Sequence, residues 1–507
     1  MRPRTLITII IAVLSIGSAH AQTACCGGST APCQQTSIRM QREALRDSIL
    51  NNITGAAVPE YTIDITRCGA RGDGKRDCRK AFAKAIAKAT EKRGVRIIVP
   101  AGTYFIKGPV TLASNVTIEL MKGATLKFSP DPAHYPIVKT SWEGTFIYNY
   151  SPMIYGYNLH DVAITGEGTI DGNAMETFAT WKSRQSEGQA LSRKMNHEER
   201  DMEQRRFGEG FWLRPQLIQM YRCERVTLQG VKITNSPFWC VHLLESENIV
   251  CRGLRYDAKL VNNDGIDPEC SRNILIEDIS FDNGDDNIAI KSGRDNDGWR
   301  IAKPSENIVI RRCHFKGLHA VVIGSEMSAG VRNVIVEDCD YAGYCKRGLY
   351  IKTNPDRGGF VRGIYVSQCH FGEVEDLLHI TSRYAGQGLD NNHFSTIEDI
   401  YIDGLTCKSA SAAALVLQGT KEKPVRNVHL DNIEVGQAKN AISFENVRDI
   451  HTGQCFIGGK AGTPTQVSAK DNIFGRDRKE DGLGRGREMT PPENPAPGMW
   501  LPAWAMG

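Results

Sequence analysis

A short pattern recurs along most of the chain and constrains its fold more than any other feature. Each copy opens on a polar or turn-forming residue and continues with mainly apolar residues, as in Asn248-Ile-Val-Cys and Asn273-Ile-Leu-Ile. From position 225 onward, neighbouring copies begin 23 to 36 residues apart. A period of about 25 residues with additions of variable length is typical of a solenoid that carries loop insertions. The copies begin at Asn115, Asp161, Arg225, Asn248, Asn273, Asn307, Asn333, Gly363, Asp399 and Asn427.

Each repeat unit consists of short β-forming runs that Gly, Asn or Asp interrupts. In the segment 273–292, the runs NILIEDIS and NIAIKS flank the polar turn FDNGDD. No helix-forming stretch separates the runs, which argues against βαβ units, and the leucine spacing of leucine-rich repeats is missing. An antiparallel sandwich would instead have hairpin turns of fixed length. The pattern predicts an all-β fold, a single-stranded right-handed parallel β-helix over residues 61–457.

Other segments depart from the repeat. Residues 80–93 have helical spacing and high helix propensity, which predicts a short amphipathic helix that caps the first coil. Residues 174–212 are highly charged and are expected to form an inserted loop or helical lid. Residues 22–60 are assigned to an N-terminal extension. The tail 458–507 is rich in Gly, Pro and charge, a composition typical of disorder.

The N-terminus has the features of an export signal. Arg2 and Arg4 precede the apolar stretch Leu6–Ile16, and Ala19-His20-Ala21 forms a cleavage site of the A-x-A type. The apolar stretch is too short for a membrane anchor, and no other segment is long and apolar enough to span a bilayer. The expected signal peptide is 1–21, and the mature protein is expected in the periplasm or outside the cell.

The chain has 15 Cys, and export permits disulfides. Two groups are candidates for bridges: Cys25, Cys26 and Cys33 near the mature start, and Cys68 with Cys78 around a Gly-rich loop. A second set is expected to stay reduced. These residues each follow a repeat start by six positions and should form an inward ladder of apolar thiols, at a strand spacing slightly too wide for a disulfide. They are Cys313, Cys339 and Cys369.

The formal net charge is only +4, too weak to indicate a nucleic-acid partner. No pair of Cys and no Cys/His cluster has the spacing of a zinc site. These features give no indication of a nucleic-acid or membrane partner, and we expect the protein to be a monomer.

Polar groups recur at intervals of about one coil, at Asp264, then Asp285 and Asp286, then His319, then Lys352. Stacked coils would place them along one groove. Carboxylates in one place repel each other, so at least one should hold a proton near neutral pH. An acid beside a base is what glycoside hydrolysis needs. Two alternatives remain, namely acidic residues that only end strands in turns and a calcium site.

The motifs resemble those of the polygalacturonase family, glycoside hydrolase family 28, from about Ile65 to Ile457, most closely its bacterial and exo-acting branches. The segments that carry the resemblance are Gly69–Gly74, Val99–Tyr104, Ile164–Asp171, Asn235–Trp239, Asn262–Asp264 for the N-x-D motif, Gly284–Asp286 for the G-D-D motif, His319 and Lys352.

This resemblance implies roles for individual residues. Asp285 would be the general acid, and Asp264 and Asp286 would hold and activate the attacking water. His319 would tune the acid through a hydrogen bond, and Lys352 would bind a substrate carboxylate. The implied reaction inverts the anomeric centre and uses neither metal nor organic cofactor. Asn262 and Lys291 are further candidates for substrate binding.

Some positions depart from the family pattern. Tyr350 replaces the Arg of the family's R-I-K motif, which removes a bidentate clamp for a carboxylate. Arg347, three residues earlier, is a candidate to compensate. Leu318 and Ala320 replace the Gly residues around the histidine, and Asn287 replaces a frequent Cys.

The function expected from these features is hydrolysis of α-1,4-galacturonosyl linkages in a pectic polysaccharide or oligosaccharide. Cleavage from chain ends is suggested by the insertion 174–212, which could block one end of the groove. Tyr350 favours an alternative, a rhamnogalacturonan or substituted-pectin hydrolase. Two other classes remain open at this point, a calcium-dependent pectate lyase and a non-enzymatic glycan-binding β-helix.

Overall fold

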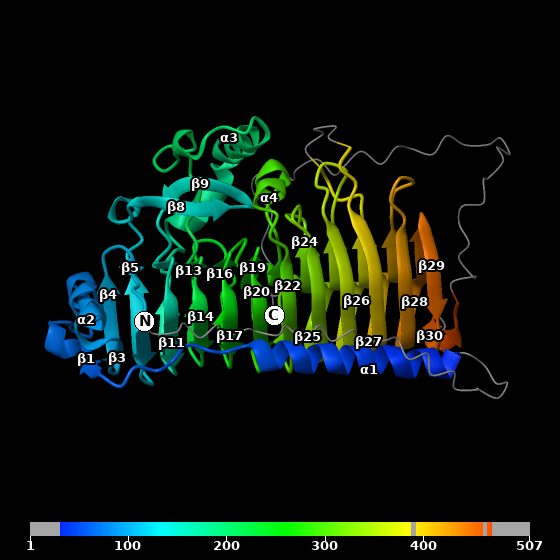
Figure 1. Cartoon of the computed structure of the whole chain (residues 1–507), viewed down its shortest axis with the longest axis horizontal. Coiled ribbons are helices and arrows are strands. Elements are labelled where there is room, and N and C mark those ends of the chain that lie inside the picture. The colour runs from blue at the N-terminus through cyan, green and yellow to red at the C-terminus, as the bar shows by residue number, and fades with distance from the viewer. Residues whose placement is uncertain (1–30, 387–391, 460–463, 469–507) are drawn as a thin grey trace, which may run out of the picture.

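The protein is an elongated stack of coils, which follow one another along its long axis in chain order (Figure 1). The computed structural model describes residues 31–386, 392–459 and 464–468. Strands from successive coils pair in parallel, and the described antiparallel pairings are β8 with β9 and β30 with β31. The parallel β-helix predicted from the repeat is confirmed.

The residues that open the repeats explain why the chain bends where it does. Asn248, Asn273, Asn307 and Asn333 have φ angles of 55–57°. Asn tolerates this left-handed conformation better than most residues, because its short polar side chain can hydrogen-bond locally. The side chains also form a ladder between coils: the Nδ2 of Asn307 donates to the Oδ1 of Asn273 at 3.1 Å, and that of Asn333 to Asn307 at 3.0 Å.

Each complete coil has up to three strands, one on each face. The first face contains β5 (Val110–Thr111), β10 (Ile154–Tyr157), β13 (Ile218–Tyr221), β16 (Val241–Leu244), β19 (Ile266–Glu269), β21 (Asp286–Ile290) and β24 (His319–Gly324). The second contains β1 (Thr62–Asp64), β3 (Val95–Val99), β6 (Val116–Leu120), β11 (His160–Gly166), β14 (Glu224–Gln229), β17 (Glu247–Arg252), β20 (Arg272–Glu277) and β22 (Ser305–Arg311).

The third face contains β2 (Asp73–Asp77), β4 (Gly102–Ile106), β7 (Ala124–Phe128), β12 (Thr169–Asp171), β15 (Lys232–Thr234), β18 (Arg255–Asp257) and β23 (His314–Phe315). In later coils one continuous strand extends through the bends and covers more than one face. These strands are β25 (Val331–Lys352), β26 (Phe360–Thr381), β27 (Thr396–Gln418) and β28 (Val425–Glu445), followed by β29 (Val447–Thr452), β30 (Cys455–Gly458) and β31 (Pro464–Gln466).

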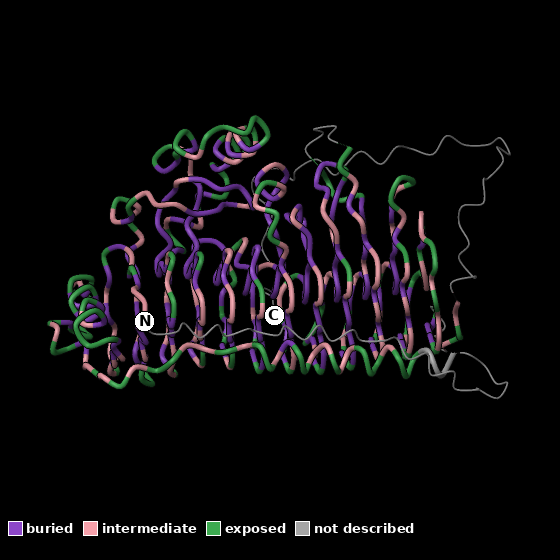
Figure 2. The backbone as a smooth tube through the Cα atoms, viewed as in Figure 1, coloured by how far each residue is buried: buried purple, intermediate pink, exposed green. Residues whose placement is uncertain are grey.

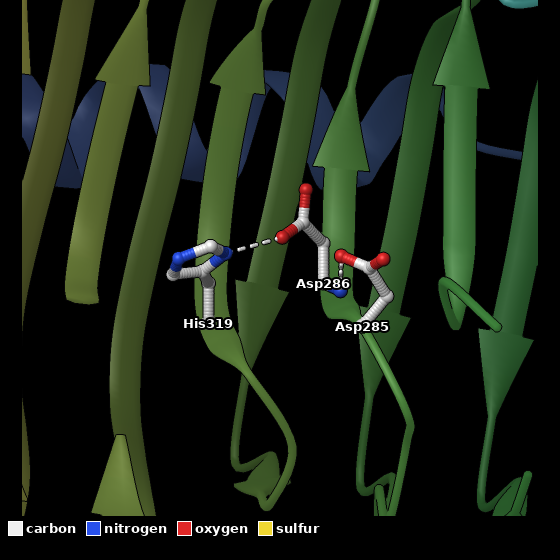
Figure 3. Close-up of side chains that lie close together, drawn as sticks. All are labelled: Asp285, Asp286 and His319. Carbon is white, nitrogen blue, oxygen red and sulfur yellow. Dashed lines mark hydrogen bonds and ion pairs between the residues drawn. The ribbon is translucent and has the colours of Figure 1, made fainter. Parts of the chain in front are cut away.

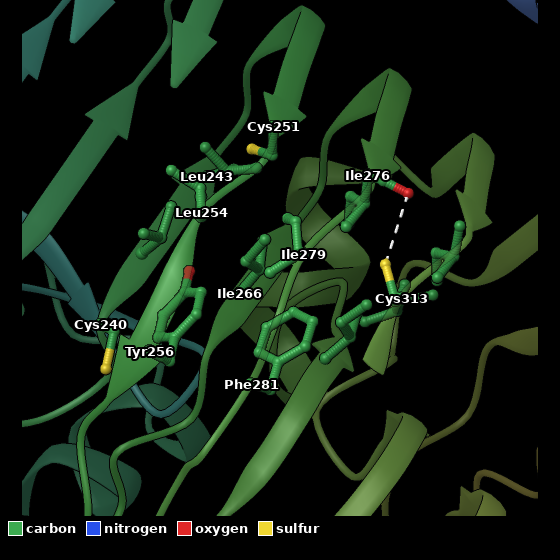
Figure 4. Packing of buried hydrophobic residues seen from close by; sticks show 14 of the residues in the cluster. Cys240, Leu243, Cys251, Leu254, Tyr256, Ile266, Ile276, Ile279, Phe281 and Cys313 are labelled. Atoms are coloured by element: carbon green, nitrogen blue, oxygen red, sulfur yellow. Dashed lines mark hydrogen bonds between the residues drawn. The ribbon is translucent and has the colours of Figure 1, made fainter. Parts of the chain in front are cut away.

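One hydrophobic core fills the coils from Ile65 to Ile457. Inward side chains stack on their counterparts in the next coil, as the rings of Tyr256 and Phe281 do at 4.8 Å between centroids (Figure 4). The ladder of Cys313, Cys339 and Cys369 belongs to this core, and all three thiols are free and buried, as predicted.

The bridge expected between Cys68 and Cys78 is wrong. Both thiols are free, and the buried thiol of Cys78 donates instead to the backbone oxygens of Arg71 and Arg76 at 3.4 and 3.3 Å. The thiol of Cys78 thus has a place within the first coil without a bridge. Cys25 and Cys26, and the side chain of Cys33, lie outside the described residues, as does the expected signal peptide 1–21.

We expect the thiols of Cys313, Cys339 and Cys369 to resist alkylation while the protein is folded, because reaction requires an accessible thiolate and all three side chains are buried. Burial also raises the pKa of the Cys313 thiol. Labelling with a maleimide, followed by peptide mass spectrometry, would compare native protein with protein in denaturant. Equal labelling of these residues in both states would contradict their place in the core.

The predicted capping helix is present as α2 (Arg79–Lys92). It buries Ala81, Phe82, Ala85 and Ile86 against the first coil. Its apolar positions recur at one-turn spacing, which explains why the helix was predictable. The short η1 (Ile65–Cys68) lies beside it.

A separate layer covers part of the first face (Figure 1). The insertion 174–212 forms η3 (Phe178–Ser183), α3 (Ser186–His197) and η4 (Met202–Gln204). It packs on an unpredicted hairpin of β8 (Ile137–Trp142) and β9 (Thr145–Tyr150) and on α4 (Asp295–Ile301). A further short helix, η2 (Pro132–His134), precedes the hairpin. Figure 2 shows the hairpin largely buried and the outer side of the insertion exposed.

A long helix, α1 (Ala31–Asn52), lies along the second face within the predicted extension 22–60 (Figure 1). Its residue Ile49 packs on a column of outward side chains from successive coils, which includes Leu275, Val309 and Ile335. In the parts of the chain that the structure describes, no helix is both long and apolar enough to cross a membrane. Most of the tail 458–507 lies outside those parts.

Candidate active site

The predicted catalytic residues meet on the first face, at the strands β19, β21, β24 and β25. The register places Asp286 directly beside His319, and His319 beside Arg347. The turn before Asp285 requires Gly284, because a Cβ there would lie 2.2 Å from the backbone oxygen of Leu260 in the preceding coil. Close stacking of the backbones therefore presents Asp285 and Asp286 at the start of β21.

Asp286 is the most tightly held member of the group (Figure 3). Its Oδ1 lies 2.6 Å from the Nδ1 of His319, and its Oδ2 lies 3.2 Å from the Nζ of Lys352. Burial would raise the pKa of Asp286, but Lys352 and His319 outweigh burial and hold it well below its usual range. Asp286 is therefore the ionised carboxylate of the site. The hydrogen bond implied between His319 and the acid goes to Asp286 instead, because the strand register pairs these two residues.

Asp285 has the opposite character. It is half-buried, and burial together with the neighbouring charge of Asp286 raises its pKa to about 6. Its Oδ2 accepts a hydrogen bond from the Nδ2 of Asn262 at 3.2 Å, and the Oδ1 of Asn262 in turn accepts from the Nη2 of Arg214 at 2.7 Å. Asn262 thus orients the carboxyl of Asp285. A carboxyl that holds its proton into the neutral range beside an ionised one can serve as a general acid.

Asp264 shares a buried position with Asp267. Burial and then the charges of Asp267 and Asp285 raise the pKa of Asp264 well above its usual range, and burial does the same for Asp267. The Nζ of Lys291 lies 3.9 Å from the Oδ2 of Asp264 and 3.6 Å from the Oδ1 of Asp267. The two carboxyls therefore share one ammonium and retain a proton, which leaves Asp286 as the carboxylate that is ionised and free to accept one.

Tyr350 and Lys352 both project outward from β25, and Ile351 between them lies in the core, as strand alternation requires. The ring of Tyr350 is only 5% exposed and contacts the rings of His319 and His379, each at 5.2 Å between centroids. Tyr350 thus fills the floor of the site and supports the cations above it.

Arg347 lies 4.6 Å over the ring of Tyr350. Its guanidinium pairs with Glu375 at 3.3 Å and with Asp376 at 3.4 Å. Arg347 therefore lies on the outward face, but its guanidinium already forms ion pairs with two carboxylates of the next coil.

Part of the site has side chains that could hold a metal ion. Asp285, Asp286 and His319 offer ligand atoms within 4.8 Å of one another. However, the ammonium of Lys352 already lies against Asp286, and His is not a preferred calcium ligand. A buried lysine in that position opposes a second cation.

Comparison with known proteins places this arrangement in a family. A model of the family described as glycosyl hydrolases family 28 matches residues 90–455, which include every predicted site residue. The chain belongs to glycosyl hydrolase family 28.

Relatives within family 28 cover most of the chain. A probable polygalacturonase of Vitis vinifera is 30% identical over 75% of this chain and 75% of its own length. An endo-polygalacturonase of Pectobacterium carotovorum subsp. carotovorum is 27% identical over 70% of this chain and 85% of its own. Among solved structures, a hyperthermoactive exopolygalacturonase from Thermotoga maritima is 32% identical and superposes with a TM-score of 0.75, covering 84% of this chain and 100% of that one.

The groove of this family 28 protein is closed on one side of the carboxylates. On β13, β16 and β19 the outward residues Gln219, His242 and Glu269 are fully buried beneath the β8–β9 hairpin. On the later strands the aligned residues are half-buried at His379, buried at Val416 and exposed at Ser443. A wall therefore covers the first face near Asp264, and the outward side chains are accessible again at Ser443 in a later coil.

The wall is built from aromatic side chains that belong to the hairpin, the insertion and the third-to-first-face turn. Trp142 stacks on Phe238 at 5.2 Å, and Phe238 stacks on Trp239 at 4.9 Å between centroids. The Nζ of Lys291 lies 4.6 Å over the ring of Trp239. The wall therefore reaches the catalytic group directly.

Sequence reasoning missed several residues of the site. Asp267 follows the core residue Ile266 on β19 and lies on the outward face beside His242, so strand alternation could have revealed it. Arg214, Glu326 and Arg294 had no motif or spacing that could reveal them. Each reaches the site from a loop, and only the fold brings those loops together.

Proposed function

We propose that the protein hydrolyses α-1,4-galacturonosyl linkages of pectin with inversion of configuration. Asp285, protonated at mildly acidic pH, donates its proton to the leaving glycosidic oxygen. Asp286, kept ionised by Lys352 and His319, accepts a proton from the attacking water. The observation that carries the proposal is the pair of adjacent carboxyls, of which Asp286 contacts Lys352 and His319 while Asp285 contacts the neutral Asn262, so that one can accept a proton and the other can donate one.

The charges around the groove favour a polyuronate. Lys352 lies at the open side of the site and Arg214 at the closed side, where it retains its charge although burial lowers its pKa to about 10. The insertion adds Lys182, whose electrostatic neighbours include Asp285. Lys352 and Lys182 would pair with galacturonate carboxylates, while the fully buried Arg214 contributes its charge only through the electrostatic potential of the site.

The other classes have less support. A calcium-dependent lyase would need a cation where Lys352 already lies, and a purely binding protein would not need two carboxyls with opposed pKa shifts. A rhamnogalacturonan hydrolase was favoured by Tyr350, but the low exposure of that ring leaves little surface for stacking a neutral sugar.

We further propose that cleavage proceeds from chain ends, because the wall beneath the β8–β9 hairpin closes the groove beside Asp264. The expected products are mono- or disaccharides from the start. We also propose that the protein is exported and acts as a monomer. The apolar N-terminal stretch and the A-x-A sequence that follows it support export.

The function is tested on polygalacturonate with two measurements on one reaction. We expect reducing ends to accumulate while the viscosity of the polymer falls slowly, since removal of terminal units barely shortens the chains. Chromatography of early products should show the smallest saccharides first. A rapid early fall in viscosity with long oligosaccharides would contradict cleavage from ends, and unsaturated products would contradict hydrolysis.

A further inference from the structure

A chain of alternating charges connects the insertion to the catalytic carboxyls. It begins on α3, where the Nη2 of Arg193 lies 2.8 Å from the Oε2 of Glu143. The Nη2 of Arg294 lies 3.9 Å from the same oxygen and 2.6 Å from the Oε1 of Glu326. The Oε2 of Glu326 lies 3.6 Å from the Nζ of Lys291. We call Arg193, Glu143, Arg294, Glu326 and Lys291 the charge ladder.

The ladder ends on the site. Lys291 lies within 4 Å of both Asp264 and Asp267, as described above. Its side chain and that of Arg294 are each 4% exposed, so solvent screens their interactions little. A change of charge at one residue of the charge ladder should therefore change the electrostatic energy of the next residue.

The hairpin tip is shaped for this contact. Glu143 and Gly144 form the two-residue turn between β8 and β9, both with positive φ. A Cβ on Gly144 would lie 2.8 Å from the Cγ of Glu326 and 2.9 Å from the backbone nitrogen of Arg294. The backbone oxygens of Glu143 and Gly144 accept from the Nε and the backbone N–H of Arg294 at 2.8 and 3.0 Å. The tip of the hairpin thus packs tightly against Arg294 and Glu326.

We propose that Arg294 and Glu326 are positioning residues for the reaction: together with the hairpin tip they hold Lys291 between Asp264 and Asp267 and so set how readily that pair loses its proton. The insertion then acts on the chemistry as well as on access to the groove. The significance for turnover rests on the proposed function and on the role that the family resemblance implies for Asp264, which is to help hold the attacking water.

Other charges also face this pair, so the ladder acts within a fixed background. By element they are Glu269 on β19, Asp285 and Asp286 on β21, Lys352 on β25, and Arg214 before β13. None of these residues is altered in the experiment below, so the background is common to all variants.

The ladder predicts shifts of opposite sign. Glu326→Gln removes a negative charge that competes for Lys291, so the Asp264–Asp267 pair should lose its proton at lower pH. Arg294→Gln frees Glu326 to attract Lys291, so the pair should lose its proton at higher pH. Each shift should amount to about 0.5 pH unit or more. The double variant, which loses both charges, should return toward the wild type.

The direct measurement is a ¹³C NMR titration of the aspartate carboxyl carbons, with Asp264 and Asp267 assigned through Asp264→Asn and Asp267→Asn. The kcat/KM of each variant on polygalacturonate, measured beside the wild type at the same pH values, shows whether the shift of the pair reaches turnover. Glu198→Gln is the matched control: this residue pairs with exposed Arg200 in the same insertion and should leave the midpoints unchanged.

The outcomes separate the possible failures. A role confined to stability would lower the melting temperature of both single variants without opposite shifts, and that result would overturn the proposal. If Arg294→Gln does not fold, Glu326→Gln and the double variant still test the proposal. The titration midpoint of the Asp264–Asp267 pair must then lie closer to the wild-type value in the double variant than in Glu326→Gln. A wild type without hydrolytic activity refutes the proposed function, while the NMR titration still tests the ladder.

Discussion

Replacement of Asp285 by Asn is expected to lower kcat/KM on polygalacturonate by roughly 10²- to 10⁴-fold without loss of the fold. Asn has the shape of Asp but no proton to give to the leaving oxygen. The amide can still accept the hydrogen bond that Asn262 donates, so the local structure should persist. Steady-state kinetics with circular dichroism as a check on folding would measure the effect.

The matched control for this variant is Asp282→Asn. Asp282 lies in the same turn, but its carboxylate pairs with Lys259 and Lys316 away from the site, at 3.0 and 3.1 Å. Activity should stay within about twofold of the wild type, under about 0.5 kcal/mol in ΔΔG‡. Full activity in purified Asp285→Asn would remove Asp285 from the role of acid.

The pH profile of the wild type provides a further check on the same assignment. The acid must be protonated to act, and the pKa of Asp285 is raised to about 6. Activity should therefore decline as the pH rises through that value, since Asp285 then loses its proton. A kcat/KM that stays constant well above pH 7 would contradict the assignment.

Replacement of Lys352 by Met is the second variant with a large expected effect. It deletes one partner of a buried charge pair, since Nζ lies 3.2 Å from Asp286 and the side chain is 12% exposed. Such truncations cost about 2–5 kcal/mol, which corresponds to roughly 30-fold to several-thousand-fold in kcat/KM. Met retains the length of the side chain, so packing against Tyr350 should change little.

The pH dependence identifies the cause of that loss. Lys352 lowers the pKa of Asp286, so its removal raises that pKa. Because the base must be ionised, the acidic limb of the profile should move to higher pH. Lys408→Met, at an exposed lysine paired with Glu373, serves as the control. An unchanged acidic limb in Lys352→Met would show that Lys352 does not tune Asp286.

The coil architecture was predictable because it depends on local chemistry. Asn at the bends, β-branched residues in the runs and a recurring spacing all express the same repeat. The grouping of Asp264, Asp285, His319 and Lys352 was predictable for the same reason, because residues one coil apart must become neighbours in a stack.

What escaped prediction depends on contacts between distant segments. Glu143 contacts Arg294 only because the β8–β9 hairpin folds back over the first face. The sequence of neither segment contains a pattern that predicts this contact. The hydrogen bond of His319 goes to Asp286 rather than to Asp285 because of the strand register. The repeat spacing predicts that register only to within one residue. The free thiols of Cys68 and Cys78 likewise depend on how the first coil closes.

Helix α1 has a consequence for how the molecule unfolds. In a solenoid each coil contacts only its neighbours, so coils can fray from an end one after another. Outward residues of successive coils, among them Leu275, Val309, Ile335 and Tyr365, share one hydrophobic cluster with α1. Loss of any of these coils would therefore also cost contacts that the helix makes with the others. The helix acts as a splint that joins neighbouring coils into a larger cooperative unit.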